Sequence, residues 1–122
     1  MYDSNPECSQ ETPKPPIMIT IEDFKKIDLR IGKIEQAEKI ENTKLVVLKV
    51  NLGNEIKNIV AGIGNKYSIE ELIGQLVVVV VNLEPKEIKG VKSEGMILAA
   101  DAPEGPVLIV PLEQVFPGTQ VR

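Results

Sequence analysis

The sequence lacks several residue types on which common protein activities depend. Its 122 residues include no histidine and no tryptophan, and Cys8 is the single cysteine. Without histidine the commonest general base and metal ligand is missing, and one cysteine cannot build a zinc site. We therefore expect no catalytic residue, no metal and no cofactor. Because Cys8 cannot form an internal disulfide, the sequence also fits a reducing compartment, and we expect a cytoplasmic protein.

Aromatic side chains are also scarce, at 3% of the chain. Tyr2 lies in a polar N-terminal stretch, Phe24 on the apolar face of a short helical pattern, and Phe116 among apolar residues near the C-terminus. Only Tyr67 remains as a candidate for stacking on a base, which is how single-strand binders commonly hold nucleic acid. A protein that holds structured RNA through phosphate, ribose and shape does not need such rings.

Charge and hydropathy restrict the partners further. The 18 acidic residues outnumber the 14 basic ones, which gives a net charge of −4. This balance argues against broad, nonspecific nucleic-acid binding, so any such site must be a local patch. No apolar run approaches the roughly 18 residues of a membrane helix, and we expect no membrane partner. Residues 1–16 are polar and proline-rich, and we expect a flexible tail there.

The apolar pattern of residues 17–63 predicts a helix followed by three strands. A short helix, capped by Thr20, precedes a strand in which Ile31 and Ile34 are expected to point inward and Lys33 outward. Gly32 interrupts the alternation there, which predicts a bulge or a sharp coil in a long strand. Two further alternating segments, separated by a Gly-Asn pair, predict a hairpin.

The second half of the chain changes pattern. The segment "SIEELIG" predicts a capped helix of about two turns. The run "QLVVVVVNL" predicts a strand covered on both faces, and "GMILAAD" and "PVLIVPL" predict further strands. Three strands, a short helix and then at least two strands match the five-stranded Greek-key barrel called the OB-fold. A two-sheet sandwich is the alternative.

The polar stretch at residues 82–95, between two apolar strands, is the main candidate for a site. It carries lysines at positions 86, 89 and 92 and glutamates at positions 84, 87 and 94. One interpretation is a solvated loop of mixed charge with no binding role. The other is that strand geometry turns the lysines toward one side, where they would hold an anionic partner.

Three neutral residues around this stretch also allow two interpretations each. The Asn82 amide either ties down loop backbone or reaches a ribose or base edge. Ser93 either caps a turn or contacts a ligand. Met96 either fills the core or forms a flexible apolar contact for a base or sugar.

Taken in order, "DFKKIDLRIGKI", "KLVVLKVNLG", "IVAGI" and "YSIEELIGQLVVVVVNLEPKEIKGVKSEGMILAA" resemble the tRNA-binding OB-fold domain family. In that family the domain is attached to methionyl-tRNA synthetases, forms their beta subunit, or occurs alone as a tRNA-binding protein. The resemblance covers about residues 18–122. It implies an all-β, five-stranded OB-fold Greek-key barrel with short helices and a C-terminal extension. It also implies a non-catalytic module that holds folded tRNA by shape and backbone, as a partner of methionyl-tRNA synthetase.

The resemblance also implies which residues bind RNA. The positions that match the family motif are Asn82, Lys86, Lys89, Ser93 and Met96. To these we add two lysines that the strand pattern turns outward, Lys33 and Lys49. Where many relatives carry a His-Pro-Asn segment, this chain reads "IENTKL". A bacterial secretion-chaperone branch shares the fold, and its binding of unfolded polypeptide in an apolar groove is the alternative function.

The C-terminal segment holds more apolar residues than a small barrel can enclose, because only alternate residues of a strand point inward. These residues are Val107, Leu108, Ile109, Val110, Leu112, Val115 and Phe116. A contiguous apolar patch of this kind usually marks an interface. Family members that occur alone pair through such extensions, so we expect a homodimer in which this segment of domain 17–122 forms the contact.

Overall fold

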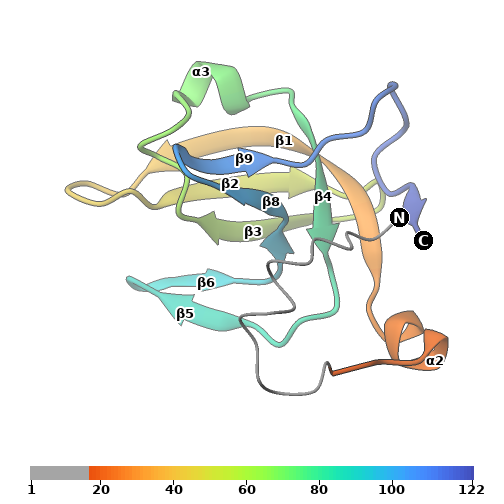
Figure 1. The fold of residues 1–122 in the computed structure, drawn as a ribbon. Coiled ribbons are helices and arrows are strands. Elements are labelled where there is room, and N and C mark those ends of the chain that lie inside the picture. The colour runs from red at the N-terminus through yellow and green to blue at the C-terminus, as the bar shows by residue number, and fades with distance from the viewer. Residues whose placement is uncertain (1–16) are drawn as a thin grey trace.

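The computed structural model describes residues 17–122, and the tail expected at residues 1–16 lies outside them. Its centre is an antiparallel sheet in the order β3-β2-β1-β4-β7 (Figure 1). These strands are β1 (Leu29–Lys39), β2 (Val46–Asn51), β3 (Ile56–Ala61), β4 (Leu76–Val80) and β7 (Met96–Ile97). Because β3 also contacts β7 and β6 (Val91–Ser93), the sheet forms a nearly closed barrel. The predicted all-β OB-fold barrel is confirmed.

Two short helices flank the barrel, and capping explains where each begins. In α2 (Ile21–Lys25), the Thr20 hydroxyl accepts a hydrogen bond from the Asp23 N–H, and the Asp23 carboxylate accepts one from the Thr20 N–H. The same reciprocal arrangement begins α3 (Ile69–Leu72). With four residues, α3 is shorter than the two turns expected. It lies over one end of the barrel, where Leu72 is fully buried (Figure 1).

The central strands follow the predicted burial. In β2, Val46, Leu48 and Val50 are buried and the intervening Lys49 is exposed. All five residues of β4 are buried. One face of β4 lines the main core, and the other packs against residues outside the barrel, so the continuous apolar run is explained.

The first strand differs from the prediction in the face that its residues occupy. Gly32, not Ile31, points into the barrel, where an added Cβ would collide with the Val50 side chain. Ile31 lies in a small apolar cluster on the outside, with Leu76 and Val78. The register with β2 shifts between Ile34 and Gln36, so the irregularity falls after Gly32 rather than at it.

The outer cluster exists because the end of the chain covers it. The last strand, β10 (Gln120–Val121), pairs antiparallel with the start of β1 and places Val121 opposite Leu29. Val121 packs against the cluster, and the Ile31 N–H donates to the Thr119 carbonyl at 2.8 Å. A strand face that would otherwise meet water is therefore apolar in this chain.

A hairpin formed by β8 (Ala99–Ala102) and β9 (Gly105–Leu108) follows β7. The Tyr67 hydroxyl holds it to the barrel by accepting a hydrogen bond from the Leu108 N–H at 3.1 Å. Tyr67 is only partly exposed and packs against the main core. The ring that the sequence leaves as a candidate for stacking therefore has a structural role.

Candidate nucleic-acid interface

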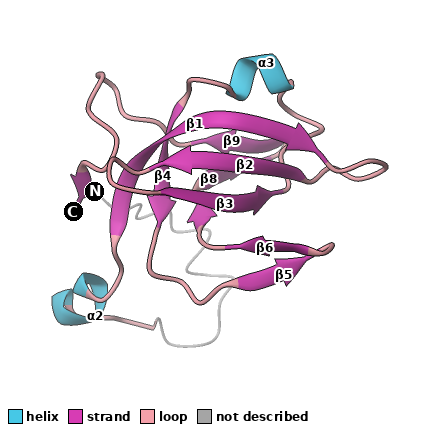
Figure 2. Cartoon of the chain, turned by 180° about the vertical axis from the view of Figure 1, so that it is seen from behind, coloured by secondary structure: helices cyan, strands magenta, loops and turns pink. Residues whose placement is uncertain are grey.

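The stretch predicted as a polar loop contains a hairpin. Its strand β5 (Lys86–Ile88) pairs with β6, and the hairpin lies beside β3 (Figure 2). Lys86 is opposite Ser93, and Glu87 is opposite Lys92. Opposed residues of an antiparallel pair share a face, so Lys86 and Lys92 project from opposite faces. The hypothesis that strand geometry turns all three lysines to one side is therefore wrong for Lys92.

The tip of this β5–β6 hairpin places a lysine in an unusual backbone conformation. Lys89 and Gly90 have φ angles of 52° and 81°, so both central residues of the two-residue turn are left-handed. This is the pattern of a type I′ turn, in which asparagine, aspartate or glycine is usual at the first position. Lysine replaces them here and carries an exposed charge at the hairpin tip.

Side chains, more than backbone pairing, join this hairpin to the barrel. The Ser93 hydroxyl accepts a hydrogen bond from the Val60 N–H at 3.0 Å and donates to the Gly95 carbonyl at 3.3 Å. The Glu94 carboxylate accepts from the Asn58 N–H at 3.0 Å, and the Glu94 N–H donates to the Asn58 carbonyl at 2.8 Å. Together these bonds close the barrel between β3 and the end of β6.

A pocket of about 530 Å³ lies between the β5–β6 hairpin and the outer face of β3. We call it the hairpin pocket. Its lining residues are Val60, Leu83, Glu84, Lys86, Ile88, Ser93, Gly95 and Met96. Three of the predicted site residues, from β5, β6 and β7, therefore meet around one opening.

Ser93 and Met96, the two motif residues near Gly95, have different environments. Met96 is 47% exposed on β7, so the interpretation of it as core filler does not hold. Ser93 is 5% exposed and its hydroxyl already has two partners. Met96 is therefore accessible to a ligand, whereas Ser93 holds the hairpin in place through its hydrogen bonds.

Asn82 lies just after the end of β4, and its side-chain nitrogen and oxygen both form hydrogen bonds with backbone groups. Its Nδ2 donates to the Lys26 carbonyl at 2.6 Å, and its Oδ1 accepts from the Asp28 N–H at 2.9 Å. These bonds support the interpretation that the amide ties down backbone. The segment that it ties is the link between α2 and β1, more than fifty residues away in sequence.

The two lysines added from the strand pattern both lie outside the barrel, at different distances from the hairpin. Lys49 on β2 is exposed, and its Nζ donates to the Asn58 Oδ1 at 3.3 Å. The Asn58 N–H also donates a hydrogen bond to the Glu94 carboxylate. Lys49 therefore lies next to the contact that fixes the hairpin to β3. Lys33 on β1 pairs with Asn51 on β2, so it lies farther from the hairpin on the same outer surface.

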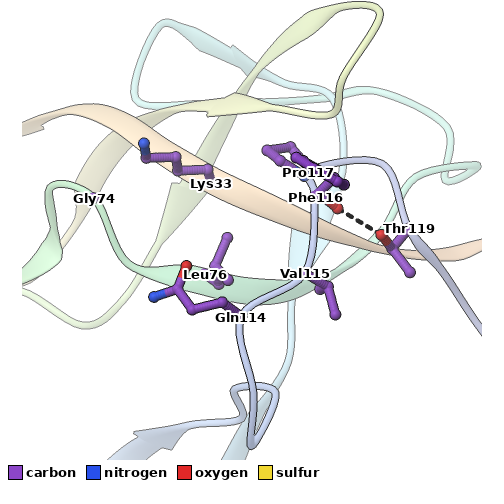
Figure 3. Close-up of a pocket in the computed structure, with 8 residues that line it drawn as sticks. All are labelled: Lys33, Gly74, Leu76, Gln114, Val115, Phe116, Pro117 and Thr119. Carbon is purple, nitrogen blue, oxygen red and sulfur yellow. Dashed lines mark hydrogen bonds between the residues drawn. The ribbon is translucent and has the colours of Figure 1, made fainter.

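Lys33 also borders a second pocket, of about 700 Å³, formed with the C-terminal segment (Figure 3). Leu76 on β4 contributes one wall and residues 114–119 the other. Phe116 is 86% exposed at this pocket, so a large apolar side chain stands at the surface there. Of the predicted site residues, only Lys33 lies at this second pocket.

Arg30 carries a side chain well shaped for phosphate, but that side chain is already paired with a carboxylate. The Arg30 guanidinium donates to both carboxylate oxygens of Asp28, at 3.0 and 3.2 Å. This hydrogen bonding raises the pKa of Arg30 above its ordinary value and holds its donors in a paired arrangement. Contact with phosphate at the hairpin therefore falls to lysines.

Several residues of the interface give no clear sequence signal. Val60 and Leu83 line the hairpin pocket, and Asn58 and Glu94 anchor the hairpin, yet none belongs to the predicted set. Val60 has the pattern of an ordinary strand residue. Glu94 resembles one more charge in a mixed loop, because its bonding partner lies 36 residues away.

Within residues 17–122, no three histidine, cysteine, aspartate or glutamate side chains gather closely enough to hold a metal ion. The helices in this described part of the chain are also too short to cross a membrane.

A nearly closed barrel with a capped helix between its third and fourth strands, and lysines on a hairpin beside the third, is an OB-type binding domain. The chain belongs to the tRNA-binding domain family. The family's sequence model, described as "Putative tRNA binding domain", matches residues 29–120, from the first residue of β1 into β10.

Similar proteins support the assignment to this family. The chain is 50% identical over 105 residues to the methionine–tRNA ligase of Pyrococcus furiosus, covering 85% of this chain and 14% of the ligase. It thus spans about a seventh of the curated relative. A MetRS related protein from Pyrococcus horikoshii has a similar structure, with a TM-score of 0.81, 38% identity, and coverage of 88% of this chain and all of that one. Chaperone CsaA from Bacillus anthracis is similar at a TM-score of 0.80 and 35% identity, covering 87% and 100%.

Proposed function

We propose that this chain is a non-catalytic module that binds folded tRNA by shape and backbone. One observation carries this proposal: three exposed lysines lie on the β5–β6 hairpin or next to its contact with β3, beside the outer surface of β2 and β3. These are Lys86, Lys89 and Lys49. In OB-folds, oligonucleotides bind this strand surface and the neighbouring loops. Because the proposed ligand is tRNA, we expect the chain to act in the cytoplasm.

The scarcity of aromatic side chains supports recognition of folded RNA. The Tyr67 hydroxyl accepts a hydrogen bond from the Leu108 N–H of β9, and Phe24 belongs to α2, which lies apart from the β5–β6 hairpin (Figure 1). Stacking of successive bases, as in single-strand binders, would find no aromatic platform among the described residues of the hairpin. Lysine contacts to phosphate together with a fixed surface shape would suffice for a structured RNA.

We further propose that the chain works with methionyl-tRNA synthetase, either as a beta subunit or as a partner in trans. The identity to methionine–tRNA ligases supports this partner. By holding tRNA near the enzyme, the module would raise the effective concentration of the substrate.

We also propose that two copies pair through the C-terminal segment. Apolar residues of that segment are exposed in the single chain, and they include Ile109, Val110, Leu112 and Phe116. Leu112 is 99% exposed, which is unusual for a leucine in a folded domain. Pairing would cover this surface and bring two hairpins onto one particle.

A binding isotherm with purified methionine tRNA, measured at two salt concentrations, tests the proposed function. We expect binding that weakens as salt rises, because each phosphate contact releases counterions. A linear RNA of the same composition serves as the control and should bind more weakly. Equal affinity for both RNAs, or no binding to either, would contradict recognition of folded tRNA.

Binding of unfolded polypeptide is the second candidate. The similarity to chaperone CsaA and the partly apolar hairpin pocket favour it. Suppression of aggregation of a reduced, unfolded client, without any affinity for tRNA, would support this function over the first.

A further inference from the structure

The hairpin pocket has a chemical character that phosphate binding alone does not use. Four of its lining side chains are apolar: Val60, Leu83, Ile88 and Met96. Leu83 is 44% exposed and Met96 is about as exposed, so this chain leaves the pocket walls open to water. Its volume of about 530 Å³ lies within the roughly 300–1,000 Å³ typical of small-ligand sites.

The same pocket carries one anionic and one cationic side chain beside its apolar walls. Glu84 and Lys86 both line it, and both are exposed. The other polar lining side chain, Ser93, is occupied by its bonds to Val60 and Gly95. The groups free to meet a ligand are therefore one acceptor and one donor.

We propose that the hairpin pocket receives a single unstacked nucleobase of the bound tRNA. This inference rests on the proposed function and specifies how that site holds its ligand. A nucleobase has two flat faces that suit apolar walls and an edge that carries both donors and acceptors. The Glu84 carboxylate can accept from an amino or imino group of the base, and Lys86 can donate to a ring carbonyl.

Met96 is suited to the flat face of such a base. A methionine side chain is flexible, and its sulfur makes favourable contacts with aromatic rings. Met96 lies on β7 next to Gly95 and pairs with Val80, so its backbone is fixed while its side chain can adjust. One base held in this way would fix the position of the RNA on lysines that otherwise contact phosphates at any register.

A nucleobase fits these observations better than the apolar side chain of a peptide. A nucleobase would use the apolar walls and both charged groups, whereas an apolar side chain would use only the walls and leave Glu84 and Lys86 solvated. Lys89 at the hairpin tip also gives the sugar-phosphate chain that carries the base a nearby cation.

Chemical footprinting of a methionine tRNA transcript tests this inference. Dimethyl sulfate reports on adenine and cytosine edges, and a carbodiimide reports on guanine and uracil edges. We expect the protein to protect a base in an exposed loop that the free transcript leaves reactive. Val60→Phe fills the pocket from a strand position that tolerates an aromatic residue, and it should abolish this protection.

The affinity of Val60→Phe for the transcript should fall by about tenfold, the reduction expected when one base no longer enters the pocket. The slope of log affinity against log salt should change little, because Lys49 and Lys89 lie outside the pocket and keep their phosphate contacts. Ile21→Phe, which adds a ring at an exposed position on α2, is the matched control and should keep both protection and affinity. If Val60→Phe fails to fold in a thermal melt, Leu83→Ala in the same pocket replaces it.

The outcomes separate this inference from the function on which it rests. A wild-type protein that does not bind the transcript contradicts the proposed function. Tight binding with identical base protection in wild type and Val60→Phe overturns the nucleobase pocket and leaves tRNA binding intact. Loss of binding to an unfolded client in Val60→Phe, with tRNA protection unchanged, would assign the pocket to peptides and also overturn the inference.

Discussion

The Ser93 hydroxyl accepts a hydrogen bond from the backbone N–H of Val60, 3.0 Å away, at the edge where β3 has little backbone pairing. This bond joins two segments that are 33 residues apart in the sequence. With the neighbouring contacts of Glu94, it fixes the distance between the β5–β6 hairpin and the barrel. The width of the hairpin pocket therefore depends on a buried serine.

The first prediction concerns that bond. Ser93→Ala should lower the free energy of unfolding by about 1–3 kcal/mol, because the Val60 N–H is left without an acceptor. Chemical denaturation measures this change. Ser68→Ala, which removes the exposed cap of α3, is the control for removal of a serine and should cost about 0.5–2 kcal/mol. A stable Ser93→Ala protein with unaltered hydrogen exchange at Val60 would contradict the anchoring role.

The second prediction separates the lysines of the hairpin by face. Changing both Lys86 and Lys89 to alanine should weaken binding to all tRNAs alike. It should also reduce the salt slope by roughly 0.7–0.9 for each phosphate that no longer meets a lysine. Lys92→Ala is the matched control. Lys92 pairs with Glu87 and projects from the face of the hairpin that does not carry Lys86, so its loss should alter the slope less. Equal slopes in all three proteins would show that neither Lys86 nor Lys89 contacts phosphate.

The third prediction concerns the backbone of Lys89. Replacing it by asparagine, which tolerates the left-handed conformation better, should raise the free energy of unfolding by about 1 kcal/mol. The same change removes a charge and should weaken tRNA binding. A thermal melt beside a binding isotherm would show the two quantities moving in opposite directions. Unchanged tRNA binding would show that the lysine is not kept at the tip for its charge, and a lower melting temperature would contradict the argument from its left-handed backbone.

The fourth prediction concerns Met96. Because this side chain is about half exposed and lies outside the core, Met96→Ala should leave the melting temperature nearly unchanged while lowering the affinity for tRNA. Leu48→Ala, a fully buried change in β2, should by contrast cost about 2–5 kcal/mol of stability. A large drop in the stability of Met96→Ala would show that the side chain supports the fold instead.

The fifth prediction concerns pairing of two chains. Light scattering at micromolar concentration should give about twice the mass of one chain. Phe116→Asp should shift it toward the monomer, because it places a charge on the apolar C-terminal surface. Ile17→Asp, at an exposed apolar residue outside that segment, should not. A wild-type monomer that binds tRNA would end the proposal of a homodimer.

Local signals in the sequence are enough to predict much of the fold. Thr20 begins α2 as its capping pattern predicts, and the continuous run in β4 is buried on both faces. Both features depend on residues close together in the chain. Alternation and capping therefore predict local structure correctly where that structure depends on the residues of a single strand or turn.

Features that the sequence does not reveal depend on contacts between distant segments. Ile31 is turned outward because β10 covers it, and no pattern near residue 31 carries that information. The sequence predicts a loop in place of the β5–β6 hairpin, because Lys89 hides its type I′ turn. Motif positions such as Asn82 and Ser93 are found from sequence, yet their hydrogen-bond partners lie 54 and 33 residues away.

The pairing of Leu29 with Val121 bears on how this domain combines with others. It brings the beginning and end of the barrel unit to neighbouring strands, about 4.8 Å apart. Both ends therefore leave the barrel at one place, away from the β5–β6 hairpin (Figure 1). A domain built in this way is portable: it can be joined to another protein at a single junction without disturbing the surface that carries its lysines.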